Sequence, residues 1–582
     1  MAVNRRHESN ASVNTFSKSD YPTGEKVVAP VNSHVGDAEY GDNFNPHQSD
    51  DLATHLHRGL RARQVTMIAL GGALGSGLLI GTGSALAQAG PGSIFISYTI
   101  LGFVVWIVLC ALGEMAAWLP LESGFTGYAT RFCDPALGFS MGYTYWFKYI
   151  ITTPNQLTAC SLVIQYWIDR ERVNPGVFIA VFLVVIIAIN YLGVRYFGEI
   201  EFWLSSAKVL TMCGLIILSL VLMLGGGPDH DRKGFRYWND PGAFKPLYAT
   251  GAKGNFLGLW STFVTATFAY LGSELIGVTV GEAQNPRRVI PRAIKLTFWR
   301  ILFFYVLSVL LIGTLVRYNS SRLSFATKQK TGASASPFVV AIIESGINTL
   351  PGFINACILI FVFSAANSDL YVATRVLYSL AKEGNSHRVF AKTDARGVPI
   401  FALGLSSLIA CIAFLNVADD SRTVFGYFVS LVTLFGLLTW ISILVSHICF
   451  IRARRAQGMG NDQMAYTAPL GLPGTYFALV FCIVIAIFNN YGVFVHVKTR
   501  ANPTFDYKNF ITGYLGIPLY LMMIVGYKVV MKSKRKKASE VDLFTGKEAI
   551  DREEEDFVAR KVERRARKPG NWFYRKFVAW LF

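Results

Sequence analysis

Charged side chains are scarce in this sequence of 582 residues: Asp, Glu, Lys and Arg make up only 16% of it, whereas 52% of the residues are hydrophobic. A typical soluble domain carries about 25% charged residues. A soluble chain of this length would split into several domains, whose surfaces would need more charge. The mean hydropathy of +0.38 agrees with this reading. The composition therefore excludes a purely soluble, disordered or collagen-like chain.

Cysteine is also sparse, and no recognisable reactive motif is present. The eight cysteines include no Cys-x-x-Cys spacing, and most of them lie inside apolar runs. We expect them to be small buried hydrophobic side chains, so a disulfide scaffold is excluded. The sequence has no His-Glu-x-x-His, clustered His and Cys, P-loop or Gly-x-Ser-x-Gly. We therefore expect no metal, no cofactor and no enzymatic activity.

Apolar runs follow one another from about residue 65 to residue 530. Crossing a bilayer takes ~20 residues in a helix. By this length we expect about twelve transmembrane helices, near 65–87, 93–117, 136–166, 176–194, 199–225, 255–280, 296–316, 352–380, 399–417, 424–450, 472–490 and 510–530. The sequence thus predicts an all-α integral membrane protein with a transporter-sized domain over 58–530, surrounded by lipid.

The two ends of the chain are polar. Residues 1–57 show no apolar period and no signal-peptide core, which predicts a disordered cytosolic tail. Residues 531–582 form a second cytosolic tail, and its aromatic end either lies on the inner leaflet or is simply exposed. Tail lysines such as Lys18 and Lys26 leave ubiquitin-ligase adaptors open as partners.

Basic residues give the expected orientation. The formal net charge of +18 would suggest nucleic acid in a soluble protein, but here it is concentrated in tails and connectors. Clusters follow spans six, eight, ten and twelve: Arg287, Arg288, Arg292 and Lys295; Lys382, Arg388, Lys392 and Arg396; Arg452, Arg454 and Arg455; and Lys532 to Lys537. All fall on one side, which the positive-inside rule places in the cytosol together with both termini. Basic residues in the opposite loops, such as Arg236, weaken this bias. We expect no nucleic-acid partner.

Two spans contain helix-breaking segments. Span one has a glycine-rich run over 71–81, and span six has Gly272 beside Glu274. Glycine is a weak helix former. Unwound backbone inside a bilayer has to face protein or a cavity, where its N–H and C=O groups can bind carboxylates and cations. Close helix packing is the alternative role for these glycines. The breaks fall in the first helix of each five-span half, which favours an alternating-access transport site.

Several motifs then follow one another in a set order: Ile68–Gly83, Gly113–Ala116, Asp134–Gly138, Gly198–Trp203, Gly234–Phe244, Glu282–Arg287 and Ser364–Ser368. Together they resemble fungal amino-acid permeases, the yeast amino-acid transporter group of the amino acid–polyamine–organocation superfamily. The resemblance covers the chain from about Arg58 to beyond Lys528. It implies a leucine-transporter-type fold, with inverted repeats over 65–225 and 255–450 and two further helices over 472–530.

Within that family the chain is most similar to the dicarboxylic amino-acid permeases, through Tyr143–Tyr149 and Pro154–Ala159. The family's general permeases usually have a neutral residue near Lys148 and a Glu where Gln156 stands. A fixed Glu would repel the second carboxylate of an acidic substrate. Gln156 can instead donate a hydrogen bond, and Lys148 adds a counter-ion. The alternatives are that Lys148 snorkels to water from a helix end and that Gln156 only joins helices.

The resemblance also implies where the substrate binds. Backbone at Gly75, Ser76 and Gly77 would hold the α-carboxylate, and carbonyls near Ala73, Phe268 and Leu271 the α-ammonium. The complete set of expected substrate-binding residues is Ala73, Gly75, Ser76, Gly77, Lys148, Gln156, Phe268, Leu271, Gly272 and Asn367. Core packing is the alternative for Phe268 and for Tyr270, its expected partner in an aromatic gate. Asn367 would either line the site or join helices.

Three charged residues at membrane depth are candidates for proton coupling. Lys208 stands where, by resemblance, proton-coupled members carry a lysine, with a structural ion pair as the alternative. Glu274 is the second candidate, or it accepts N–H bonds that order the unwound segment. Asp369 is a further intramembrane carboxylate. Glu114 is expected to gate the cytosolic side with Arg131 or the basic connectors.

The sequence as a whole predicts a proton-coupled symporter that imports glutamate and aspartate across a fungal plasma membrane. Its expected partners are therefore the amino-acid substrate, protons and the lipid bilayer. A permease of broad specificity and a nutrient-sensing receptor of the same fold are the alternatives. A membrane-bound enzyme is disfavoured because no nucleophile–base pair stands out.

Overall fold

The structure, a computed structural model, describes residues 67, 74–121, 123–278, 294, 296–323, 336–417, 421–495, 505–548, 550–552, 554–555 and 559. Ala73 and the predicted tail over 1–57, with Lys18 and Lys26, lie outside these residues. The aromatic end of the chain, from Trp572 to Phe582, lies outside them too. The expectations for these segments stay predictions.

Every regular element in the described part of the chain is helical, which confirms the all-α prediction there. In the first half the elements are η1 (Gly77–Gly81), α2 (Thr82–Ala89), α3 (Pro91–Trp118), α4 (Gly124–Phe132), α5 (Pro135–Ile164), α6 (Pro175–Tyr191), α7 (Val194–Met223), η2 (Trp238–Gly242), α8 (Gly251–Tyr270) and α9 (Leu275–Val278). In the second half they are η4 (Ile301–Val306), α11 (Leu307–Leu315), α13 (Pro337–Glu344), α14 (Leu350–Lys382), η5 (Arg388–Ala391), α15 (Ile400–Ala410), η6 (Cys411–Val417), α16 (Ser421–Ala456), α17 (Gly471–Ile487), η7 (Tyr491–Val493), α18 (Tyr507–Tyr514) and α19 (Gly516–Met531).

The described helices make this a multi-pass membrane protein. Six of them are long and apolar enough to cross a bilayer, or seven if α18 and α19, which meet at a bend of 42°, form one span. The other predicted intervals hold shorter or interrupted helices, or a more polar one such as α5. Large apolar side chains stay exposed on outward faces, among them Val184, Leu210 and Val529 at 66, 76 and 71%. Such faces suit contact with lipid tails, because apolar surface is more stable against hydrocarbon than against water.

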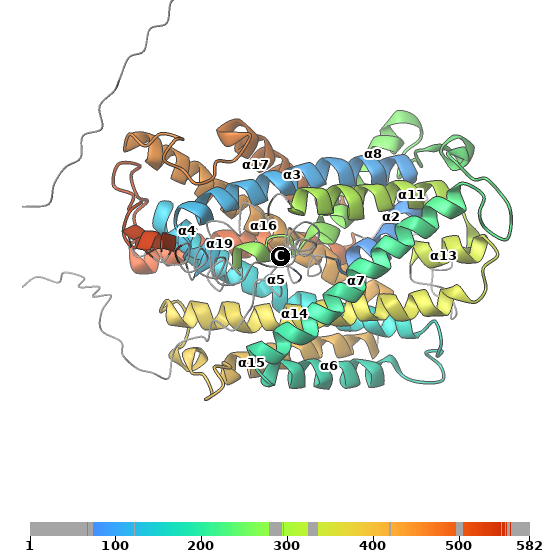
Figure 1. The fold of residues 1–582 in the computed structure, drawn as a ribbon, viewed down its shortest axis with the longest axis horizontal. Coiled ribbons are helices and arrows are strands. Elements are labelled where there is room, and N and C mark those ends of the chain that lie inside the picture. Colours follow the sequence, from blue (N-terminus) through green and yellow to red (C-terminus); the bar gives the residue numbers. More distant parts are fainter. Residues whose placement is uncertain are drawn as a thin grey trace, which may run out of the picture. The chain divides into compact units, whose positions relative to one another are not determined.

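Helix α5 lies at the centre of the bundle, where it packs mainly against α14 and α16 (Figure 1). Its start is specified locally: the Asp134 carboxylate accepts a hydrogen bond from the N–H of Ala136 at 2.9 Å, and Pro135 occupies the first turn. Pro154 lies inside the helix and removes one backbone donor there. Helices α3, α8 and α11 lie on one side of this centre, and α6 and α15 on the other.

A buried ion network joins α3 to α16. Glu114 pairs with Arg454 at 3.2 Å and with the His447 imidazole at 3.1 Å, and it accepts a hydrogen bond from the N–H of Ala468 at 2.8 Å. Arg454 belongs to the basic cluster expected at the end of this span, and so it is one of the partners expected for Glu114. Arg131, the other expected partner, instead bonds the chain beyond α19.

The segment 541–547, which we call the C-terminal clasp, packs back onto the helix bundle. Val541 and Leu543 are buried, and the Trp118 indole donates to the Leu543 carbonyl at 2.9 Å. Arg131 donates to the Asp542 carboxylate at 2.9 Å and to the Thr545 carbonyl at 2.6 Å. The start of the predicted C-terminal tail is therefore part of the fold.

Candidate substrate-binding site

The first break is a π-helical turn. After Gly75 and Ser76 the chain enters η1, whose wider turn passes into the α-helix of α2. Turns of this kind leave backbone groups without regular helical partners and are frequent at functional sites. The glycines here also permit close packing. A Cβ placed on Gly77 would lie 2.5 Å from the Cα of Ala269 in α8.

The second break separates α8 from α9. Helix α8 ends at Tyr270, Leu271 is extended, and Gly272 has a φ of +91°, a conformation that favours glycine. The N–H of Gly272 is not in a helical ladder and donates to the Glu274 carboxylate at 3.2 and 3.3 Å. Glu274 therefore does accept the N–H bond that orders the unwound segment, as one of the two sequence interpretations had it.

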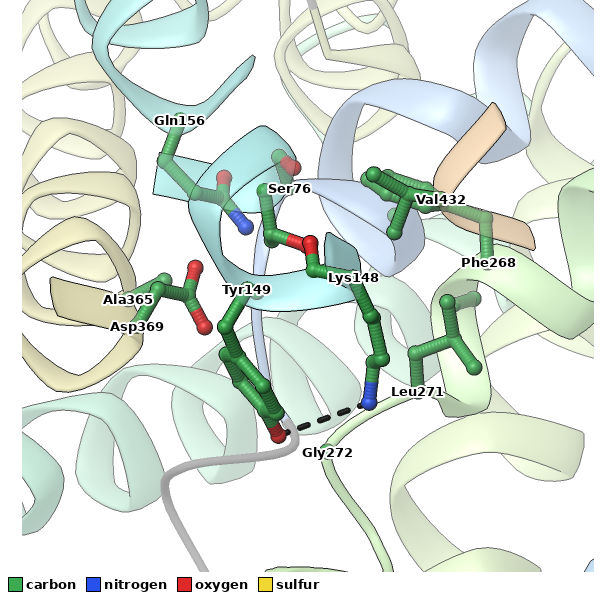
Figure 2. Close-up of a pocket in the computed structure, with 14 residues that line it drawn as sticks. Ser76, Lys148, Tyr149, Gln156, Phe268, Leu271, Gly272, Ala365, Asp369 and Val432 are labelled. Atoms are coloured by element: carbon green, nitrogen blue, oxygen red, sulfur yellow. Dashed lines mark hydrogen bonds between the residues drawn. The ribbon is translucent and has the colours of Figure 1, made fainter. Parts of the chain in front are cut away.

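The two breaks face one cavity together with α5 and α14 (Figure 2). The cavity holds about 410 Å³ of empty space, including its open mouth. Its lining includes eight of the ten residues expected to bind substrate: Gly75, Ser76, Gly77, Lys148, Gln156, Phe268, Leu271 and Gly272. Of the other two, Ala73 lies outside the described residues and Asn367 lies elsewhere. The lining also includes Asp369, one of the proton candidates.

Three polar atoms buried in this cavity have no hydrogen-bond partner among the described residues. They are the hydroxyl oxygen of Ser76, the amide oxygen of Gln156 and one carboxylate oxygen of Asp369. Buried polar groups in proteins are nearly always paired. A polar ligand bound in the cavity would form hydrogen bonds with these three atoms.

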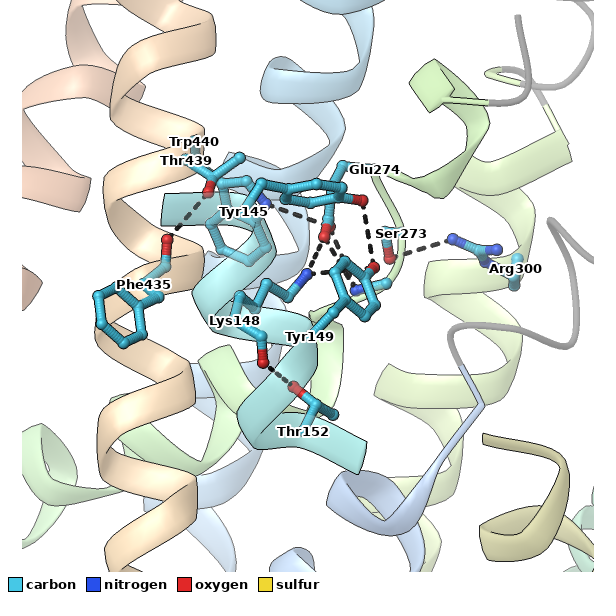
Figure 3. Close-up of polar contacts among 11 residues, drawn as sticks. Tyr145, Lys148, Tyr149, Thr152, Ser273, Glu274, Arg300, Phe435, Thr439 and Trp440 are labelled. Carbon is cyan, nitrogen blue, oxygen red and sulfur yellow. Dashed lines mark hydrogen bonds and ion pairs between the residues drawn. The ribbon is translucent and has the colours of Figure 1, made fainter. Parts of the chain in front are cut away.

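Lys148 projects from the middle of α5 and is buried, which argues against snorkelling from a helix end. Its ammonium pairs with the Glu274 carboxylate, and it lies 3.4 Å from the Tyr149 hydroxyl (Figure 3). The rings of Tyr145 and Tyr149 also lie beside it, at 5.0 and 4.5 Å from their centroids. Burial of a cation among these groups favours a direct role in the cavity.

Lys208 is buried in α7 and does not line the cavity. Its ammonium lies 3.7 Å from the carboxylate of Glu201, on the same helix, and Glu201 also accepts a hydrogen bond from Ser364 of α14 at 2.6 Å. The structural ion pair considered for Lys208 is thus present, and the pair links α7 to α14. Lys208 also interacts electrostatically with Asp369, which connects it to the cavity wall.

Two other expected site residues serve packing. Asn367 accepts a hydrogen bond from the Asn190 amide at 3.0 Å and so joins α14 to α6. Tyr270 donates to the Tyr98 carbonyl at 2.9 Å and stacks on Tyr305 at 4.4 Å, and it is not part of the cavity lining. Phe268 does line the cavity, edge-on to Phe425 at 6.1 Å.

The structure adds residues that the sequence reasoning missed. Glu201 and Arg300 are buried charges, and Arg300 donates to the Ser273 hydroxyl at 3.1 Å. The rule that flagged Lys208, a charge at membrane depth, would have flagged both. They were missed because each lies within a few residues of an expected span boundary, where flanking charges are normal. Trp440 of α16, which donates to Glu274 at 3.3 Å, carried no such signal.

The polar groups that line this cavity are suited to binding a small solute. Among the described residues, no group of three or more His, Cys, Asp and Glu side chains could hold a metal ion. The cavity offers the ammonium of Lys148, the hydroxyl of Ser76 and unpaired oxygens of Gln156 and Asp369. Such groups suit a small zwitterionic or anionic solute.

Comparisons with known proteins agree with this geometry. A family model described as amino acid permease matches residues 64–540. The dicarboxylic amino acid permease of Saccharomyces cerevisiae is 52% identical over 93% of this chain and 89% of its own length. The proline-specific permease of Emericella nidulans is 38% identical over 93% of this chain and 96% of its own length.

The fold has a relative among solved structures. The crystal structure of a mutant manganese transporter of Eremococcus coleocola superposes with a TM-score of 0.52 at 11% identity. The match covers 81% of this chain and 94% of the transporter. At that identity the likeness concerns the fold alone. The matched family model and the relatives give the assignment: the chain belongs to the amino acid permease family, and is a transporter rather than an enzyme.

Proposed function

We propose that the protein is a proton-coupled symporter that imports acidic amino acids, glutamate and aspartate, across the plasma membrane. The observation that carries the proposal is Lys148, a buried ammonium at the wall of the cavity between the two breaks. An acidic substrate brings a second carboxylate, which a fixed cation in a low-dielectric site stabilises. The name of the 52% identical relative supports the same substrate class.

The rest of the site serves the groups that all amino acids share. The backbone at Gly75, Ser76 and Gly77, where the chain enters η1, holds the α-carboxylate, as helix breaks in transporters do for anionic groups. Carbonyls near Phe268 and Leu271 hold the α-ammonium, together with Ala73 by resemblance. Gln156 faces Gly75, since a Cβ there would lie 3.6 Å from its amide nitrogen.

The transport cycle uses the proposed leucine-transporter-type arrangement: repeats over 65–225 and 255–450, then helices over 472–530, with both tails in the cytosol. Lys208, Glu274 and Asp369 carry the proton coupling, and Asn367 supports α14 behind the site. Inward proton flow offsets the import of an anion against an inside-negative potential. Net positive charge movement then needs more than one proton per glutamate.

The test is uptake of labelled glutamate into cells that lack other amino-acid permeases, at an acidic and at a near-neutral external pH, with unlabelled amino acids as competitors. We expect faster uptake at the acid pH, and competition by aspartate but not by neutral or basic amino acids. Competition by all classes would instead identify a permease of broad specificity. An absence of uptake by a protein that reaches the cell surface would favour a nutrient-sensing receptor.

A further inference from the structure

The ion pair between Lys148 and Glu274 joins α5 to the unwound segment between α8 and α9 (Figure 3). The side chains of both residues are almost completely buried, at 2 and 1% exposed. Because the pair is shielded from water, only protein groups can stabilise its charges. Removing either charge leaves the other one buried without a counter-ion.

Glu274 is held by three elements at once. Besides Lys148 it accepts hydrogen bonds from the Gly272 N–H at 3.2 Å and from the Trp440 indole at 3.3 Å. The carboxylate is therefore a junction of α5, α16 and the break. A change in its charge would act on all three.

The two partners differ in their access to the cavity. Lys148 is part of the cavity wall, whereas Glu274 is not. A carboxylate that entered the cavity would therefore meet an ammonium that is already paired with Glu274.

Two carboxylates on one buried ammonium disfavour each other's ionised form. Lys148 and Glu274 already neutralise each other in the substrate-free site. An acidic substrate adds one net negative charge to this pair. One proton taken up at the same place would restore neutrality.

The other titratable or charged groups around Glu274 are Tyr145 and Tyr149 of α5, and Arg300 and Tyr305 of the helix over 296–315. Asp369 is also near these two tyrosines. Helices α3 and α4 also pack on α9, but their charged side chains, Glu114 and Arg131, are paired with Arg454 and Asp542.

We propose that Glu274 is the counter-ion of Lys148 in the substrate-free site. When the side-chain carboxylate of an acidic substrate takes its place there, Glu274 accepts a proton. This inference rests on the proposed function. In the substrate-free site the ionised Glu274 neutralises Lys148. When an acidic amino acid binds, a proton from the external solution bonds to a carboxylate oxygen of Glu274, and the substrate carboxylate becomes the counter-ion of Lys148. On the cytosolic side the substrate leaves, Glu274 releases its proton, and the original pair re-forms.

The proposal separates acidic from neutral substrates. Glutamine has the shape of glutamate without the second charge, so it can bind while Glu274 stays ionised on Lys148. Glutamate binding should therefore be linked to one more proton than glutamine binding. One linked proton changes a Kd by about tenfold per pH unit.

The experiment measures the binding of glutamate and glutamine to the purified full-length protein at two pH values about two units apart. For the wild type we expect the Kd of glutamate to increase by up to about 100-fold, relative to the Kd of glutamine, as the pH rises by these two units. Glu274→Gln, which mimics the protonated acid, should remove this difference and bind glutamate equally tightly at both pH values. Glu114→Gln makes the same change in a buried ion network outside the cavity, and should keep the difference.

Equal pH slopes for glutamate and glutamine in the wild type would overturn the proposal, and this result needs no variant to fold. A Glu274→Gln protein that keeps the wild-type slopes, or a Glu114→Gln protein that loses them, would overturn it as well. If the wild type binds no acidic amino acid at any pH, the proposed function itself fails. That outcome is distinct from equal slopes in a protein that does bind glutamate.

Discussion

Replacing Gly77 by alanine should disrupt the place where the two interrupted helices cross. The added Cβ would lie 2.5 Å from the Cα and 2.9 Å from the backbone nitrogen of Ala269. Both are backbone atoms, so no side-chain rotation relieves the overlap. Overpacking in protein interiors destabilises by about 1–3 kcal/mol, a factor of roughly 5 to 150 in a conformational equilibrium. We expect the upper part of that range for Gly77→Ala.

The assay is the melting temperature of the purified protein in detergent, with its abundance at the cell surface. Two further glycines provide a graded series. A Cβ on Gly75 would meet only ordinary contacts, at 3.6 Å from Gln156 and 3.8 Å from Ala365, and a Cβ on Gly214 of α7 would have nothing within 4 Å. Gly214→Ala should raise the melting temperature slightly, because alanine is favoured over glycine inside a helix by about 0.5–1 kcal/mol. A Gly77→Ala protein as stable as Gly214→Ala would refute the close crossing of the two breaks.

Three other predictions concern the charges. Lys148→Gln and Gln156→Glu should each lower glutamate uptake more than the uptake of any neutral amino acid, measured by competition; equal losses for all substrates would remove both residues from selectivity. Lys208→Met should abolish the stimulation of uptake by external acid, and an unchanged pH profile would leave the lysine with a structural role alone. Arg131→Ala should loosen the C-terminal clasp and speed proteolysis of the tail at neutral pH. Burial raises the pKa of Asp542, but hydrogen bonds from Thr545 and Phe544 and the charge of Arg131 outweigh burial and lower this pKa. The clasp is therefore stable above the usual pKa of Asp542 and weakens only as the pH falls through the lowered value. Protection from proteolysis that persists in Arg131→Ala would show that the clasp is held by its apolar side chains.

Much of this site could be predicted from the sequence because glycines and charged residues are unusual within apolar membrane spans. Glycines in an apolar run, and a glutamate beside Gly272, predicted interruptions in two spans. The structure has a π-helical turn at Gly77–Gly81 in the first and an unwound segment at Leu271 and Gly272 in the second. The same scarcity of charge pointed to Lys148, Lys208 and Asp369, all of which are buried. These signals are local, so a single sequence carries them.

What the sequence could not supply was pairing. Lys148 and Glu274 are 126 residues apart, and no local sequence pattern predicts that they form a pair. Lys208 gave the opposite difficulty: its partner Glu201 lies close by on the same helix, but near a span boundary it resembled a flanking charge. Asn367 was placed in the site by its motif, whereas its partner on α6 is a matter of tertiary packing.

The C-terminal clasp also orders the events of biosynthesis. Trp118 receives its partner Leu543 425 residues later in the chain. At usual elongation rates of about 5–20 residues per second, that interval lasts roughly 20 to 85 seconds. During this time the ends of α3 and α4 that the clasp covers are made but unfinished, and a chain that stops early never completes them. A chain that ends before Leu543 leaves the Trp118 indole and the Arg131 guanidinium without the partners that they have in the complete fold.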